Sequence, residues 1–211
     1  MGFPVYDFRN PEHITNMLVT PEIRSRFMWM DPGDEFNSRH SHDLGHEIFL
    51  VLQGKMEFEI DGETEILEPG QLCYALRDQP HAVRVIGDEP VVIYLSVTPH
   101  ILPTHTGRTQ EGEALPIRFS PHGSYDVPFD ETVTRSDRVE RHRSAVDAFA
   151  QAAQALVDQH REVLSGLAAS ESEDQATRNA MWEKLYHVHR NLTELNDSWN
   201  DLAPTLTEGT K

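Results

Sequence analysis

The sequence predicts a mainly β protein with an α-helical extension, namely a small antiparallel sandwich or barrel followed by a helical hairpin. Between Phe27 and Pro99, short strand-like runs alternate with turn signals, and no helix-like period separates them. Between residues 133 and 204, apolar residues recur at spacings of three or four, which is typical of amphipathic helices. Residues 100–132 lack either period and are interrupted by prolines, which indicates a connector.

These changes of pattern divide the 211 residues into four segments. Residues 1–26 are a lead-in that we expect to hold a short helix or turn and an edge strand. Residues 27–99 form the β-barrel core, residues 100–132 wrap it, and residues 133–204 form the hairpin. The length suits one main domain plus an appendage.

The core contains a series of short strands joined by Gly- and Pro-containing turns. Met56, Phe58 and Ile60 alternate with acidic residues, as expected for a half-buried strand, and Asp61-Gly62 after them is a hairpin turn signal. The expected strands are Phe27–Met30, His46–Leu52, Met56–Ile60, Thr64–Leu67, Leu72–Leu76, His81–Ile86 and Val91–Val97. We expect one further strand in the connector, at Ile117–Phe119.

The last third of the chain predicts two helices with narrow apolar seams that pack on each other. The break between them lies near residues 166–174, where Ser170 and Glu173 fit a capping box. Pro204 ends the second helix.

Composition narrows the range of partners and locations. The net charge is −17, from 35 acidic and 18 basic residues, and such a surface repels nucleic acid and anionic membranes. A single cysteine, Cys73, allows no intrachain disulfide, and the sequence holds no signal-peptide pattern and no apolar run of membrane-spanning length. We therefore expect a cytoplasmic protein with no nucleic-acid or membrane role.

Four side chains in the core have the spacing of a metal site. His40 and His42 are two apart in an extended segment and therefore project from one face. The bend at Asp43-Leu44-Gly45 allows Glu47 to point back toward them, and His81 arrives from a distant strand. Three imidazoles and one carboxylate suit Fe, Mn, Ni, Co, Cu or Zn better than Ca or Mg, and they leave up to two open positions.

This pattern resembles the first motif of the cupin superfamily, G-x5-H-x-H-x3,4-E-x6-G, with its last glycine at Gly54 and with six residues between Gly33 and His40. The second motif is only partly matched, by Pro80-His81 and the Pro69-Gly70 turn. The resemblance covers about residues 27–97. It implies a double-stranded β-helix (jelly roll), one divalent transition metal ion on His40, His42, Glu47 and His81, and a homodimer.

Other candidate residues have simpler interpretations. We expect His46 to face outward because it adjoins Glu47. His100 and His105 lie just past the last strand, where they either line the mouth of the barrel or, as is commoner, are loop histidines at the surface. Because side chains alternate along a strand, Tyr74 shares a face with Leu72 and Leu76, and we expect this face to lie inside the barrel. Cys73 then points to the opposite face, where we expect an inert packed thiol.

Three functions fit the predicted site. The first is a metal-dependent oxidoreductase, a dioxygenase acting on a small organic substrate, with Glu47 as a ligand that also serves as a base. The second is a non-redox isomerase or lyase, with Tyr74 and Tyr94 as proton-transfer candidates. The third is a ligand-binding or sensor module in which the helical hairpin assembles subunits.

Overall fold

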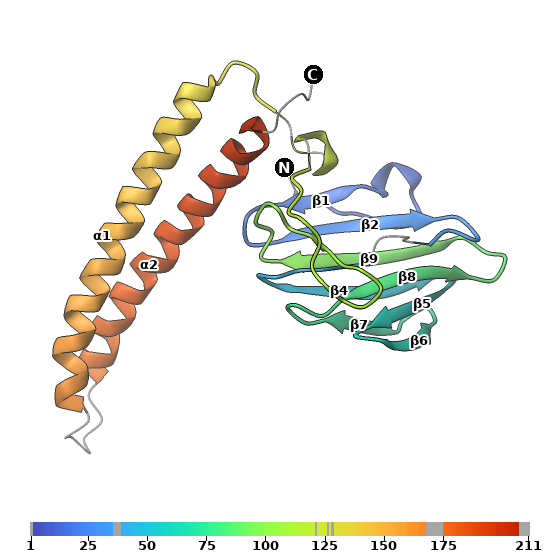
Figure 1. Ribbon diagram of the computed structural model, residues 1–211, viewed down its shortest axis with the longest axis horizontal. Helices are drawn as coiled ribbons and strands as arrows, with labels where there is room; N and C mark the ends of the chain where they lie inside the picture. Colours follow the sequence, from blue (N-terminus) through green and yellow to red (C-terminus); the bar gives the residue numbers. More distant parts are fainter. Residues whose placement is uncertain are drawn as a thin grey trace. The chain divides into compact units, whose positions relative to one another are not determined.

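The computed structural model describes residues 2–35, 39–120, 122–125, 127, 129–167 and 175–206 (Figure 1). The chain divides into two compact units at the boundary between Phe129 and Asp130. The first unit contains the strands and the second contains the two long helices, and each is described by itself.

The first unit consists of two five-stranded sheets in which all strand pairs are antiparallel, the arrangement that the sequence predicts. The first sheet has the order β1 (Asn16–Val19), β2 (Arg24–Met30), β9 (Val91–Thr98), β4 (His46–Gln53) and β7 (Leu72–Ala75). The second has the order β10 (Thr106–Gly107), β3 (His40–Ser41), β8 (His81–Ile86), β5 (Lys55–Ile60) and β6 (Glu63–Leu67). A short 3-10 helix, η1 (Pro11–His13), precedes β1.

The core lies between the two sheets. It consists of the side chains that face inward along each strand, usually every second residue. Val51 and Ile93 from the first sheet and Met56 from the second are fully buried. Phe49 of β4 packs on Phe58 of β5 across the core, with ring centroids 5.1 Å apart. Burial of these side chains is the main stabilising contribution of the barrel.

The outer faces of the two sheets differ in character. The second sheet presents ion pairs, with Arg84 on Glu57 and Arg39 on Glu59, as expected for a face in contact with water. The first sheet instead exposes large apolar side chains at Trp29, Leu72, Tyr74 and the adjacent Leu76.

Turns follow the sequence signals closely. Asp61 and Gly62 both have positive φ, at 53° and 82°, as a two-residue hairpin turn between β5 and β6 requires. Gly54 has φ 73°, and a Cβ at this position would lie 2.6 Å from the Pro90 carbonyl oxygen. This position between β4 and β5 therefore requires glycine both for its backbone angle and for space.

The connector differs from its predicted form. The expected strand at Ile117–Phe119 is wrong, because these residues make no ladder with either sheet. The chain pairs with the barrel earlier instead, through β10, whose Gly107 lies opposite His40 of β3. The 3-10 helix η2 (His122–Tyr125) follows.

The second unit is a helical hairpin of α1 (Arg135–Leu167) and α2 (Gln175–Leu202), which run side by side (Figure 1). Arg138 of α1 is buried and its Nε donates to Asp201 at 2.9 Å. The proposed capping box at Ser170 and Glu173 lies outside the described residues. The second helix ends at Leu202 and is followed by the 3-10 helix η3 (Ala203–Leu206), which contains the predicted stop Pro204.

Among the described helices, none has the length and apolarity that crossing a membrane requires.

Candidate metal centre

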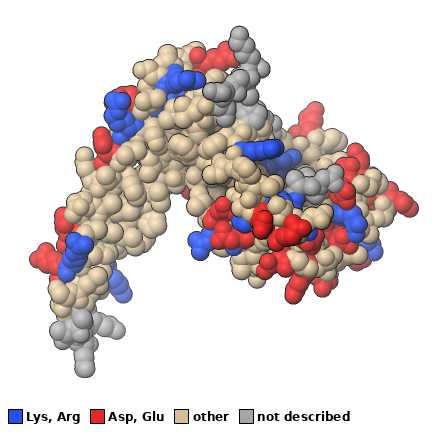
Figure 2. Space-filling view, viewed as in Figure 1, with Lys and Arg blue, Asp and Glu red and all other residues tan. Residues whose placement is uncertain are grey.

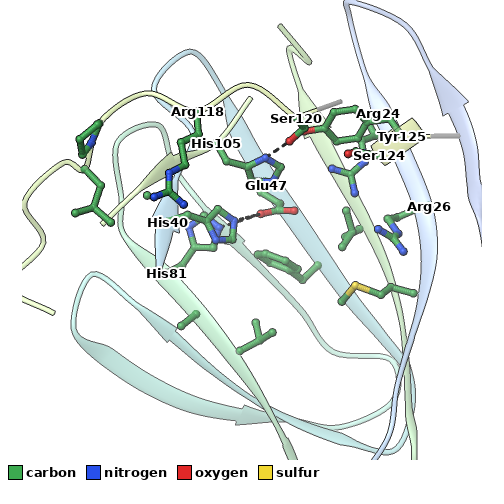
Figure 3. Close-up of a pocket in the computed structure, with 18 residues that line it drawn as sticks. Arg24, Arg26, His40, Glu47, His81, His105, Arg118, Ser120, Ser124 and Tyr125 are labelled. Carbon is green, nitrogen blue, oxygen red and sulfur yellow. Dashed lines mark hydrogen bonds and ion pairs between the residues drawn. The ribbon is translucent and has the colours of Figure 1, made fainter. Parts of the chain in front are cut away.

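The four predicted ligands meet between the two sheets (Figure 3). His40 lies on β3 and is the register partner of His81 on β8, so these two side chains project together from the second sheet. Glu47 faces them from β4 of the first sheet, and His42 follows β3 directly. His42, Glu47 and His81 are almost fully buried, and His40 is partly exposed.

Their donor atoms form one compact set. Glu47 Oε2 lies 2.9 Å from His81 Nε2, 3.0 Å from His42 Nε2 and 3.8 Å from His40 Nε2. One ligand atom from each of the four residues lies within 4.8 Å of all the others. Neighbouring donors at right angles around an ion, each about 2.1 Å from it, are about 3 Å apart, so the spacing fits one ion.

Two backbone carbonyls fix the orientation of the buried imidazoles. The Thr104 carbonyl lies 2.6 Å from His42 Nδ1, and the Gln79 carbonyl lies 2.9 Å from His81 Nδ1. A carbonyl only accepts, so both Nδ1 atoms donate their protons outward. In the neutral imidazoles the Nε2 lone pairs then point at the Glu47 carboxylate.

This donor set requires a positive charge at its centre. Burial alone raises the pKa of Glu47, but hydrogen bonds with His40, His42 and His81 outweigh it and hold that pKa well below its usual range. Without an ion, these hydrogen bonds need a proton on each ring nitrogen that faces Glu47, and several adjacent imidazolium ions would repel one another. With neutral rings, the buried carboxylate faces the Nε2 lone pairs of His42 and His81, which is costly. One divalent cation satisfies all four acceptors, so the residues present fit a metal ion.

The local chain path explains how Glu47 joins the histidines. Residues 43–45 form the predicted bend between β3 and β4. A Cβ on Gly45 would lie 2.2 Å from the Thr98 carbonyl oxygen, closer than any side chain permits. The absence of a side chain at Gly45 therefore lets β4 start against the end of β9, with Glu47 directed inward.

The candidate centre opens into a cavity of about 580 Å³ (Figure 3). His40, Glu47 and His81 line it, so the centre is accessible to a small molecule. The other described lining residues are Arg24, Arg26, Met28, Phe49, Ala82, Val83, Leu95, His105, Gly107, Leu115, Pro116, Arg118, Ser120, Ser124 and Tyr125. The volume lies in the usual range of small-ligand sites.

The two tyrosines nominated from the sequence do not line this cavity. Tyr74 is 57% exposed, so the expectation that it points inward with Leu72 and Leu76 is wrong. On β7, Ala75 lies opposite Glu47 and Cys73 opposite Phe49, which places Cys73 on the inner face and Tyr74 on the outer one. Tyr94 is half-buried on β9 and packs edge-on against Phe27, with ring centroids 6.3 Å apart.

The structure decides between the two interpretations of the connector histidines, and neither residue is a surface loop histidine. The expectation of surface loop histidines is wrong for His100, which is 2% exposed, and His105 lines the cavity with its ring 4.9 Å from that of His40. Pairing of β10 with β3 brings this segment back over the barrel, a contact that sequence spacing does not reveal. Burial, with the charges of His40 and His42, lowers the pKa of His105 to about 2.

The structure agrees with the predicted exposure of His46 and with the prediction that Cys73 is a packed thiol, but Cys73 lies on the inner face of β7 and not on the face opposite to the core. His46 is exposed, and its Nδ1 accepts a hydrogen bond from the Arg77 backbone N–H at 2.9 Å. Cys73 packs against the core, and burial followed by the charge of Glu47 raises the pKa of its thiol to about 12, so it is unreactive at neutral pH.

Comparison with known proteins finds a family match for part of the strand unit. Residues 26–98 match the Cupin_2 family, described as a cupin domain. The polyketide synthase CurC of Streptomyces cyaneus is 33% identical over 84 residues, which cover 38% of this chain and 54% of that protein. The match therefore spans about half the length of this curated relative.

Two solved bacterial structures are similar to part of the chain. One is an uncharacterized conserved protein with a double-stranded β-helix domain from Klebsiella pneumoniae, with 21% identity and a TM-score of 0.42 over 46% of this chain and 91% of that one. The other is KdgF from Halomonas sp., with 26% identity and a TM-score of 0.38 over 42% of this chain and 79% of that one.

Proposed function

Since residues 26–98 form a cupin domain, we propose that this protein is a metal-dependent oxidoreductase, a dioxygenase that acts on a small organic substrate. One observation supports the proposal above all others. Three of the four candidate ligands, His40, Glu47 and His81, line a cavity of about 580 Å³. An ion held by these residues would therefore be accessible to a small molecule in the cavity.

The ligand chemistry defines the class of ion. Three imidazoles and one carboxylate suit Fe, Mn, Ni, Co, Cu or Zn, and four protein ligands leave up to two positions open. When bound, a redox-active ion of this group supplies electron exchange with dioxygen. The residues that would hold it are His40, His42, Glu47 and His81.

The protein's own residues orient the candidate ligands, exclude water from part of the cavity and provide a base. The Thr104 and Gln79 carbonyls hold the His42 and His81 rings with Nε2 inward. Phe49 and Leu95 are buried and line the cavity, so they exclude water from its floor. Glu47 is the residue that we assign to proton acceptance, because a carboxylate that releases an ion is free to take a substrate proton.

A non-redox isomerase or lyase is the second candidate, but its proton-transfer residue differs from those expected from the sequence. Tyr74 and Tyr94 lie outside the cavity, whereas Tyr125 lines it and its hydroxyl is 3.5 Å from His105 Nδ1. Tyr125 is therefore the proton-transfer group for this alternative, in which His40, His42, Glu47 and His81 would hold an ion that polarises a substrate carbonyl. Turnover by the zinc-loaded protein without oxygen would favour it.

Oxygen consumption tests the proposal. The full chain is loaded separately with Fe(II), Mn(II), Ni(II), Co(II) and Cu(II), and oxygen uptake is followed with a panel of small organic acids, phenols and diketones. We expect substrate-dependent uptake with at least one metal, lost in His81→Ala and retained in His46→Ala. His46 is a matched control because it is exposed and adjoins Glu47. Equal uptake by wild type and His81→Ala, or none with any metal, would contradict the proposal.

We also propose that the protein acts as a homodimer. The outer face of the first sheet exposes Trp29, Leu72, Tyr74 and Leu76, whereas the outer face of the second sheet presents ion pairs. Exposed apolar side chains gathered on one face are typical of an association surface. An uncharged face also allows two chains of net charge −17 to approach each other there.

A further inference from the structure

We propose that His105 is a substrate-binding residue, whose Nε2–H donates a hydrogen bond to a carbonyl oxygen of an organic substrate with an apolar body. This inference deepens the proposed function, and it rests on that function only in placing the substrate in the same cavity. The juxtaposition that supports it is a fifth imidazole, supplied by the connector, beside the candidate ligands in a cavity with apolar walls (Figure 3).

The first argument is the position of His105. Its ring centroid lies 4.9 Å from that of His40 and 4.8 Å from that of His42, whereas those two centroids are 5.4 Å apart. His105 is nevertheless not one of the four residues whose ligand atoms gather within 4.8 Å of one another. It lines the same cavity as His40, Glu47 and His81. A molecule that lies beside the candidate ligands in this cavity therefore also meets His105.

The second argument is that one nitrogen of the ring has a partner and the other is available. Tyr125 is 7% exposed, and its hydroxyl lies 3.5 Å from His105 Nδ1. A buried tyrosine hydroxyl needs an acceptor, so we assign this hydrogen bond to donation by Tyr125. In a neutral imidazole that accepts at Nδ1, the proton lies on Nε2. No described residue pairs with Nε2, and it is not among the buried polar atoms of the described residues that lack a partner, so it reaches open space.

The third argument is that the residues on both sides of His105 are tied to the ligand segment. The Thr104 carbonyl accepts a hydrogen bond from His42 Nδ1 at 2.6 Å. Thr106 Oγ1 donates to Asp43 Oδ2 at 2.6 Å, and β10, which begins at Thr106, pairs with β3. The backbone of His105 is therefore fixed before any substrate arrives, which reduces the entropy lost when the substrate binds.

The fourth argument gives the class of ligand. The cavity has apolar walls, which suit an aliphatic or aromatic body and are formed by Met28, Phe49, Val83, Leu95 and Leu115. A carbonyl oxygen only accepts and therefore matches an N–H donor, whereas a hydrocarbon of the same shape would leave that N–H without a partner. The net charge of −17 and the acidic side chains that dominate the visible surface of the strand unit favour an uncharged ligand over an anion (Figure 2). The ligand is therefore a ketone or a similar carbonyl compound.

Two ligands of similar shape test the inference. Acetophenone has a carbonyl group where ethylbenzene has a methylene group, and calorimetry measures the binding of both to the full chain, zinc-loaded and metal-free. We expect His105→Phe to lower the ratio of acetophenone affinity to ethylbenzene affinity about tenfold in both forms, as the loss of one hydrogen bond implies. His105→Gln should keep this ratio within about threefold of wild type, because its amide N–H replaces the donor.

His46→Phe is the matched control, because His46 is exposed and is not one of the residues that line the cavity. It should leave the affinity ratio unchanged. Circular dichroism establishes that each variant is folded, and zinc titration should give the same stoichiometry for His105→Phe as for wild type. Absence of acetophenone binding to wild type, or the same ratio in wild type and His105→Phe, would overturn the inference. Loss of zinc from His105→Phe would also overturn it, because His105 would then be a metal ligand.

Nitrogen NMR of the full chain labelled with 15N-histidine tests the assigned donor without a change at His105. We expect the His105 proton on Nε2, and we expect the Nε2 signal to shift when acetophenone, but not ethylbenzene, is added. Tyr125→Phe should move part of the proton population to Nδ1. A proton on Nδ1 in wild type would overturn the inference.

The metal-free measurements separate this inference from the proposed function. A carbonyl preference that depends on His105 in the metal-free protein supports the hydrogen-bond donor even if no metal gives oxygen uptake. Oxygen uptake by a protein that lacks this preference would refute the role of His105 alone.

Discussion

Replacement of Gly45 by alanine tests the argument that close backbone contact aims Glu47 at the histidines. The added Cβ would lie 2.2 Å from the Thr98 carbonyl oxygen, 2.6 Å from the Thr98 carbonyl carbon and 2.7 Å from Pro99 Cδ. Two of these three atoms belong to the backbone at the end of β9, so no side-chain rotation relieves the clash. Either β4 or β9 must move.

The expected cost follows from the size of the clash. Overpacking a well-packed site typically costs 1–3 kcal/mol, and a backbone contact places Gly45→Ala at the upper end, at about 3 kcal/mol. The unfolding entropy of a unit of roughly 130 residues is about 0.27 kcal/mol/K, so the melting temperature should fall by about 10 °C. The affinity for metal should fall as well, because the displaced strand contains Glu47.

Thermal unfolding followed by circular dichroism, together with zinc titration, provides the assay. Gly166→Ala is the control, since a Cβ there meets nothing within 4 Å and alanine favours the α1 helix. A Gly45→Ala protein that melts within 2 °C of wild type and binds zinc equally well would refute the reasoning.

Three further predictions concern metal, pH and assembly. A metal ion at about 100 times its Kd should stabilise the protein by about 2.7 kcal/mol and raise its melting temperature by about 10 °C. The melting temperature of His42→Ala should not change. An equal rise in both proteins would contradict the assignment of His42 as a ligand. Burial, with repulsion from Arg24, lowers the pKa of His100 to about 4, so the unfolded chain binds more protons between about pH 6.5 and pH 4. Wild type should therefore lose more stability than His100→Gln in urea titrations as the pH falls from 7 to 5, and parallel losses would contradict this. Light scattering should give the mass of a dimer for wild type and for the control Ile66→Glu. The double variant Leu72→Glu/Tyr74→Glu should have the mass of a monomer. An unchanged mass in the double variant would exclude the outer face of the first sheet as the dimer interface.

Much of the barrel was predictable because its signals are local. Strand alternation and turn residues depend on neighbours in the chain, and the predicted strand His81–Ile86 has the observed bounds. The candidate ligands were also predictable, because His40 and His42 share a face by parity and the bend before Glu47 is visible in the sequence.

The errors arise where long-range pairing decides the outcome. Parity groups Leu72 with Tyr74 but does not say which face is inside, and the register with β4 places both outside. His105 reaches the cavity only because β10 returns to β3. The arginines at the start of β2 were missed because two cations on an inner face contradict the hydrophobic signal of a strand, which begins at Phe27 when judged from the sequence alone.

The most direct test of the central claim is elemental analysis of the purified, tag-free chain beside His81→Ala and His46→Ala. We predict about one equivalent of a single transition metal in wild type and in His46→Ala, and none in His81→Ala. Equal metal content in all three proteins, or none in wild type after reconstitution, would contradict a metal centre on His40, His42, Glu47 and His81.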